Sequence, residues 1–163
     1  MVLLLLVGCA GAMSLEKREE VYGKTVPEII QAFASNEMKL GDSWKIYLNA
    51  FDPDADMKAI ICNLGQTGVG TYPISLIRIP EDQQRDLSGF IFLNTLGGPR
   101  ELETQSLTLT IQIQDKAGHF SKASSFALTF NPLGQQQNPP PDVFKDKDLG
   151  PIAIVLKPLA RGD

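Results

Sequence analysis

Three aspartates at alternate positions, Asp52, Asp54 and Asp56, are the residues of this chain whose spacing best suits ion chemistry. Carboxylates at alternate positions of a tight loop can converge on one hard cation, with calcium ligands at about 2.4 Å. An EF-hand loop would place glycine after the third ligand, where this chain has Met57. The sequence therefore favours a solvated acidic turn over a calcium site. Asp115 joins such a site only if its loop lies at the same end of the molecule.

Other reactive groups are few, because the chain has one histidine, His119, and two cysteines, Cys9 and Cys62. They cannot build a closed zinc centre, and they offer little general-base catalysis near neutral pH. Ile60, Cys62 and Leu64 alternate onto one face of an expected strand, so we expect a buried, inert thiol at Cys62. His119 is expected in a turn. No cofactor other than calcium is suggested.

The first eight residues are apolar and uncharged, and this run is too short to cross a bilayer as a helix, which needs about 20 residues. It is typical of an export signal. The residues Leu6-Val7-Gly8-Cys9 resemble the bacterial lipobox, and this resemblance implies lipidation of Cys9 after removal of residues 1–8. Ala10 resembles the residue that directs lipoproteins to the outer membrane. The alternative is a buried N-terminal strand.

Composition and charge limit the class of protein and the kinds of partner. It has 163 residues, of which 43% are hydrophobic and 21% charged, as expected of one globular domain. The net charge of −4 provides no basic field for a phosphate backbone, so nucleic acid is not an expected partner.

Residues 9–25 are expected to form a solvated tether, since residues 13–24 are rich in Glu, Lys and Arg. Period-two alternation follows in residues 26–131, and it indicates half-buried antiparallel strands. The alternation places six residues in the core: Trp44, Ile46, Leu48, Cys62, Leu109 and Ile111. The expected strands cover residues 29–34, 44–50, 58–64, 71–79, 88–95, 107–113 and 123–130. About seven strands without a convincing helix predict an all-β, immunoglobulin-like antiparallel sandwich.

Segments 26–35, 40–44 and 50–56 are similar to the opening of bacterial immunoglobulin-like, PKD-like and cadherin-like modules. Segment 111–121 resembles their closing hairpin. Ala55 stands where these modules usually have glycine. The resemblance implies a β-sandwich that serves as a stalk, adhesin, spacer or binding domain, and it leaves the particular role open.

The carboxyl region has a different organisation. Residues 132–150 are expected to form a polar, proline-rich linker, and residues 151–163 a tail with a short strand at 152–156. We expect this strand to dock onto its own sandwich rather than onto a partner. The terminal Arg161-Gly162-Asp163 matches the integrin-recognition tripeptide, a match that three common residues often produce by chance.

Together these features predict a lipid-anchored protein of the bacterial cell envelope. We expect it at the outer membrane, facing the periplasm or the surface, with a non-catalytic interaction or scaffolding role and an envelope protein as partner. One alternative is a carboxylate-based glycan hydrolase, which needs two facing carboxyls about 5 to 9.5 Å apart. The acidic segment 81–86 is instead expected to be a solvated loop. The other alternative is a small-solute-binding module with a roomy pocket.

Overall fold

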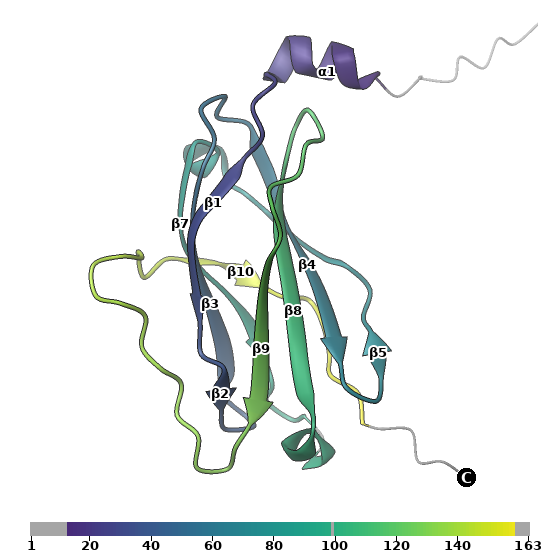
Figure 1. The fold of residues 1–163 in the computed structure, drawn as a ribbon, viewed down its shortest axis with the longest axis vertical. Helices are drawn as coiled ribbons and strands as arrows, with labels where there is room; N and C mark the ends of the chain where they lie inside the picture. Colours follow the sequence, from purple (N-terminus) through teal and green to yellow (C-terminus); the bar gives the residue numbers. More distant parts are fainter. Residues whose placement is uncertain (1–12, 99, 159–163) are drawn as a thin grey trace, which may run out of the picture.

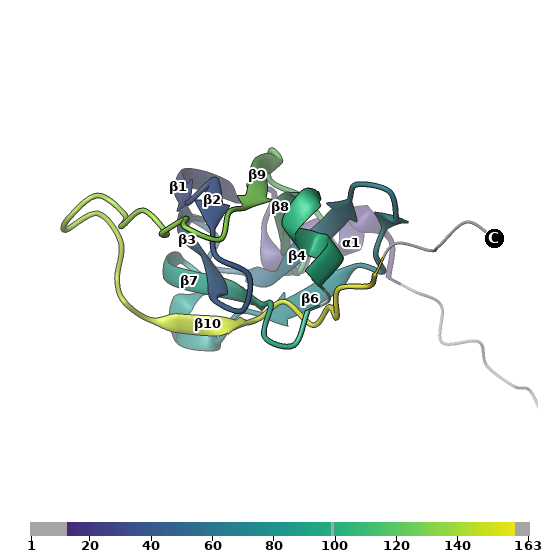
Figure 2. The same ribbon diagram turned by 90° about the horizontal axis from the view of Figure 1, so that it is seen from below.

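Two β-sheets face each other in the computed structural model, which describes residues 13–98 and 100–158 (Figures 1 and 2). One sheet has four strands in the order β1-β3-β7-β10, and the other has six, in the order β2-β9-β8-β4-β5 with β6 paired to β4. The strands are β1 (Glu28–Ala34), β2 (Glu37–Met38), β3 (Ser43–Phe51), β4 (Met57–Gln66), β5 (Gly70–Thr71), β6 (Ser75–Arg78), β7 (Asp86–Asn94), β8 (Ser106–Asp115), β9 (Ser124–Phe130) and β10 (Asp148–Pro151). Of the expected all-β antiparallel sandwich, the two-sheet sandwich is confirmed, in a fold that is mostly β with one short helix.

The core forms from the alternating faces of the long strands. In β3 and β8 every second residue is buried, because successive side chains of a strand point to opposite faces. The six residues expected in the core are all fully buried: Trp44, Ile46, Leu48, Cys62, Leu109 and Ile111. The indole N–H of Trp44 donates to the carbonyl oxygen of Ser35 at 2.8 Å, so the one polar atom of this ring is satisfied.

The structure corrects the expected strand count and pairing. The described residues form ten strands rather than about seven. The single strand expected over residues 71–79 is interrupted around Pro73, which has no N–H for a ladder, and gives β5 and β6. The pairing is also not purely antiparallel, because β2 runs parallel to β9 and β10 runs parallel to β7.

The C-terminal strand lies earlier than expected. β10 covers Asp148–Pro151 and pairs with β7 of the same chain, so it begins inside the segment expected to be a linker. Residues 152–156 form no strand, because the N–H of Ile154 turns back to the carbonyl of Ile152 at 2.8 Å. Ile152 and Leu156 are nevertheless buried in the core, and the tail therefore docks on its own sandwich.

Gly89 permits the close approach of this tail to β7. A Cβ atom at Gly89 would overlap the carbonyl oxygen of Lys147, which enters β10. That carbonyl accepts the N–H of Phe90 at 2.8 Å, and the N–H of Ile152 donates to Phe92 at 2.8 Å. A glycine in the middle of a strand is typical of such close backbone contacts.

The expected tether carries one short helix, α1 (Leu15–Tyr22), which has no buried residue. In Figure 1 it lies across one end of the sandwich. Two 3-10 turns, η1 (Glu81–Gln83) and η2 (Arg100–Thr104), complete the regular structure. Within the described part of the chain, no helix combines the length and the apolar character needed to cross a membrane.

Replacing Ile152 by alanine tests the docking of the tail. Ile152 is 3% exposed, so its truncation should lower the free energy of unfolding by about 2 to 5 kcal/mol. The matched control is Val155→Ala, because Val155 is 85% exposed and its truncation should change stability by less than about 0.5 kcal/mol. Urea unfolding followed by Trp44 emission measures both. Equal midpoints for the two variants would show that the tail is not part of the core.

Candidate functional site

Three carboxylates gather at the end of the sandwich that α1 covers: Asp52, Asp56 and Asp115. Asp52 follows β3, Asp56 precedes β4, and Asp115 is the last residue of β8. Each offers one oxygen, and these oxygens lie within 4.8 Å of one another. The three residues are 0%, 4% and 1% exposed. The N–H of Lys116 donates to the carbonyl of Asp56 at 3.0 Å and joins the two loops that carry the cluster.

Asp54 is not part of this cluster. It is exposed, and its Oδ2 accepts the N–H of Thr25 at 2.7 Å. The loop is a tight turn in which the N–H of Asp54 donates to Oδ1 of Asp52 at 3.0 Å and Ala55 adopts a φ of 58°. A left-handed residue reverses the chain, so positions 52, 54 and 56 do not share one side as they would in a strand. Asp115 takes the third place instead of Asp54.

The carboxylates of Asp52 and Asp56 are buried with few hydrogen-bond partners. Oδ2 of Asp52 and both carboxylate oxygens of Asp56 form no hydrogen bond of ordinary geometry with the described residues. The backbone N–H of Ala117 nevertheless lies close enough to Asp56 to lower its pKa in part. Two like charges 4 to 5 Å apart repel by about 3 to 4 kcal/mol at an effective dielectric of about 20. Burial raises the pKa of Asp56 to about 7, with contributions from its contact with Asp52 and from the charge of Asp115. Of the three loop aspartates, Asp52 and Asp56 are therefore buried, whereas the sequence favours a solvated turn for all three.

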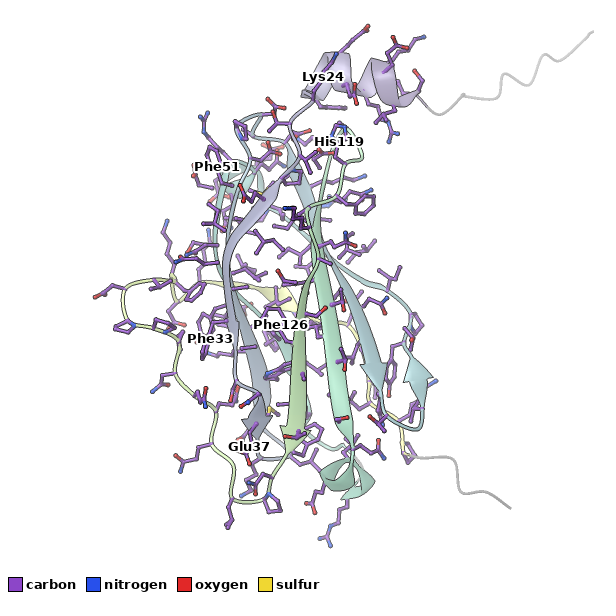
Figure 3. All side chains as sticks on the ribbon, viewed as in Figure 1. Lys24, Phe33, Glu37, Phe51, His119 and Phe126 are labelled. Atoms are coloured by element: carbon purple, nitrogen blue, oxygen red, sulfur yellow. The ribbon has the colours of Figure 1, made fainter. Side chains whose placement is uncertain are left out.

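Asp115 connects the cluster to α1 through His119. Oδ1 of Asp115 accepts the N–H groups of Gly118 and His119 at 2.5 and 2.7 Å. Oδ2 of Asp115 lies 2.7 Å from Nδ1 of His119, whose Nε2 lies 3.1 Å from Oε1 of Glu19. The hydrogen bond to Glu19 is the main cause that raises the pKa of His119. Figure 3 shows His119 directly below the helix.

Residues 13–25 are thus attached to the sandwich at two points, Glu19 and Thr25. Ser14 caps the helix by accepting the N–H of Lys17, and the chain leaves the helix at Gly23. Gly23 has a φ of 113°, and a Cβ atom there would overlap the carboxylate of Asp54, so this junction requires glycine. The segment expected to be a solvated tether therefore contacts this end of the sandwich through Glu19 and Thr25, while its helix has no buried residue.

The remaining candidate groups lie apart from the cluster. Burial raises the pKa of the Cys62 thiol to about 12, which makes it inert as a nucleophile. In the acidic segment 81–86, Asp82 is exposed and pairs with Lys147 at 3.4 Å. Cys9 and Arg161-Gly162-Asp163 lie outside the described residues.

No family model matches the sequence, and no curated protein matches it. Among solved structures, the chain is similar to the PKD domain of an M14-like peptidase from Thermoplasmatales archaeon SCGC AB-540-F20. The TM-score is 0.39 at 10% sequence identity, and the match covers 64% of this chain and 94% of that chain. Function is therefore inferred below from the residues of the chain itself.

Asp54→Ala tests the docking of residues 13–25. The change removes the acceptor of the Thr25 N–H, so trypsin should cut after Lys24 several-fold faster in the folded protein. Asp82→Ala is the control, because Asp82 is an exposed aspartate far along the chain from this contact. Cleavage is followed by mass spectrometry. Identical rates in the two variants and the unaltered protein would mean that Asp54 does not hold this segment.

Proposed function

We propose that this chain is a non-catalytic immunoglobulin-like module, anchored by lipid on Cys9 at the bacterial cell envelope, with an interaction or scaffolding role. One observation carries the non-catalytic part: the reactive side chains of the described residues are enclosed or engaged. The Cys62 thiol is buried, both ring nitrogens of His119 have carboxylate neighbours, and the acidic cluster is buried. None of these groups lines the surface hollows beside residues 78–81, 94–98, 136–139 and 153–157.

The two alternatives have less support. A glycan hydrolase needs two carboxyls that face each other across an open site. Here the clustered carboxylates are buried, and a surface hollow of about 400 Å³ is lined by Lys58, Arg78 and Lys116 with residues 79–81 and 84. A small-solute pocket is mostly apolar with a few polar groups. The lining of this hollow is more apolar than polar, but it carries four charged side chains rather than a few orienting polar groups: Lys58, Arg78, Glu81 and Lys116.

The topology supports the immunoglobulin-like assignment. Strands β1, β3 and β7 share one sheet and β4, β8 and β9 the other. This arrangement corresponds to strands A, B and E facing C, F and G of the immunoglobulin fold. In constant-type domains strand D lies beside E, and here β10 from the C-terminal tail takes that position beside β7.

An exposed apolar surface supports the interaction role. Ile74, Leu76 and Val155 are 62%, 65% and 85% exposed. Ile74 and Val155 line the same hollow of about 260 Å³, where the segment before β6 meets the tail. Leu76 follows Ile74 by two residues and is exposed on β6, so alternation of the extended chain places it on the side of Ile74. Large exposed apolar side chains that lie near one another mark interaction surfaces. We call Ile74, Leu76 and Val155 the apolar face.

The two ends of the molecule suit a lipid anchor. Cys9 precedes Ser14 by five residues, which span at most about 18 Å when extended. A lipid on Cys9 would therefore hold the α1 end close to the membrane. Figure 1 shows β5 and the end of the described tail at the half of the sandwich away from α1. The apolar face would thus be presented away from the membrane.

Cys9→Ser tests the anchor. In a bacterial host, the chain with an added basic leader segment should incorporate labelled palmitate and partition into detergent, and the variant should lose both. Cys62→Ala is the matched control, because Cys62 is buried and should not affect labelling. Equal labelling of Cys9→Ser and the parent chain would exclude Cys9 as the lipid site.

Site-specific crosslinking tests the interaction role. A photoreactive residue at position 76 should give an adduct of one discrete mass in native envelopes, because Leu76 belongs to the apolar face. The same residue at position 31 is the control, since Gln31 is exposed on β1 in the other sheet. An equal adduct pattern from both positions, or none from position 76, would contradict an interaction through the apolar face.

A further inference from the structure

We propose that Asp52, Asp56 and Asp115 bind one divalent cation of the calcium class at the end of the sandwich beneath α1. This site is not the calcium site considered from the sequence, which consisted of Asp52, Asp54 and Asp56 in one loop. It takes its ligands from two loops that are far apart in the sequence. It also goes beyond the interaction role proposed above and does not depend on it.

The unpartnered oxygens are the first support. Asp56 is 4% exposed with both carboxylate oxygens unpaired among the described residues, and Oδ2 of fully buried Asp52 is unpaired as well. Buried polar atoms are nearly always paired, and an unpaired buried carboxylate is among the most costly groups in a protein. These unpaired oxygens belong to two carboxylates that, with Asp115, each offer one oxygen within 4.8 Å of the others, so the cluster requires a positive ligand or a proton.

Asp115 completes the donor set. Three hydrogen-bond contacts, two with backbone N–H groups and one with His119, occupy its carboxylate. A carboxylate has about four lone-pair directions, so one direction remains for an ion. These contacts hold the side chain in place, as the outer contacts of metal ligands commonly do.

The chemistry and spacing of the donors select the ion. An all-carboxylate set is hard, which suits calcium or magnesium rather than zinc or copper. Opposite oxygens around calcium lie about 4.6 to 5.2 Å apart, twice the ligand distance, and the three oxygens here lie within 4.8 Å. Magnesium usually retains several waters, for which a buried cluster has little room. Calcium is therefore the preferred ion.

Among residues 13–98 and 100–158, no lysine or arginine side chain forms an ion pair with the three aspartates. Arg18 of α1 lies against Gly118, but it forms no ion pair with the three aspartates in the described part of the chain. The charged neighbour that does contact the cluster is His119, which binds Asp115 alone. A bound cation would draw the β3–β4 loop and the β8–β9 turn together and would steady the contact from His119 to Glu19.

Calcium titration of the full chain in mild detergent tests the site. After removal of metal with EDTA, calorimetry with calcium chloride should show one site per chain. At 100-fold excess over the dissociation constant, the melting midpoint should rise by about 5 to 10 °C. Asp56→Asn, Asp52→Asn and Asp115→Asn should each weaken binding by at least about tenfold. Asp54→Asn is the matched control and should bind calcium as the parent chain does.

If Asp52 and Asp56 share a proton instead, the parent chain will show neither calcium heat nor a shift of the midpoint, and Asp56→Asn will melt higher than the parent. Loss of binding in Asp54→Asn with retention in Asp56→Asn would also overturn the proposal, since the ion would then lie elsewhere. Failure here leaves the lipid and crosslinking tests unaffected, because neither involves these aspartates.

Discussion

The burial of three carboxyl groups at one end of the sandwich is the constraint on which the surrounding structure depends. The β3–β4 loop and the β8–β9 turn must both lie there, and the contact from Lys116 to Asp56 joins their backbones. Asp115 then holds His119, and His119 holds Glu19 of α1. Neutralising the cluster therefore stabilises more than two loops, because the same residues position the segment that leads towards Cys9.

The C-terminal tail provides a partner for β7, which would otherwise be an edge strand of its sheet. β10 pairs with β7, and the tail buries Ile152 and Leu156 against the core. This docking covers backbone groups that would otherwise template association with another chain. The N-terminal segment and the tail are thus both bound to the sandwich, and the apolar face is left exposed where the tail meets the segment before β6.

Sequence patterns predicted the sandwich because alternation in β3 and β8 is unbroken, and the expected core residues such as Trp44 and Leu109 are buried. The break at Pro73 could have been foreseen, since proline cannot donate to a ladder. The pairing of the tail with β7 could not have been foreseen, because only the structure shows that Gly89 makes room for the backbone of Lys147. Ala55 stands where the resembling modules usually have glycine, which is a signal for a left-handed residue. The sequence did not show that this conformation separates Asp54 from the cluster.

X-ray diffraction tests the central claim most directly. Crystals are grown with calcium, and others with manganese as an anomalous substitute. The cation site proposed here predicts an anomalous peak within ligand distance of Asp52, Asp56 and Asp115, with Asp54 still bonded to Thr25. A map without a peak at the cluster, in which oxygens of Asp52 and Asp56 approach each other around a shared proton, would contradict it. A peak beside Asp54 would contradict it equally.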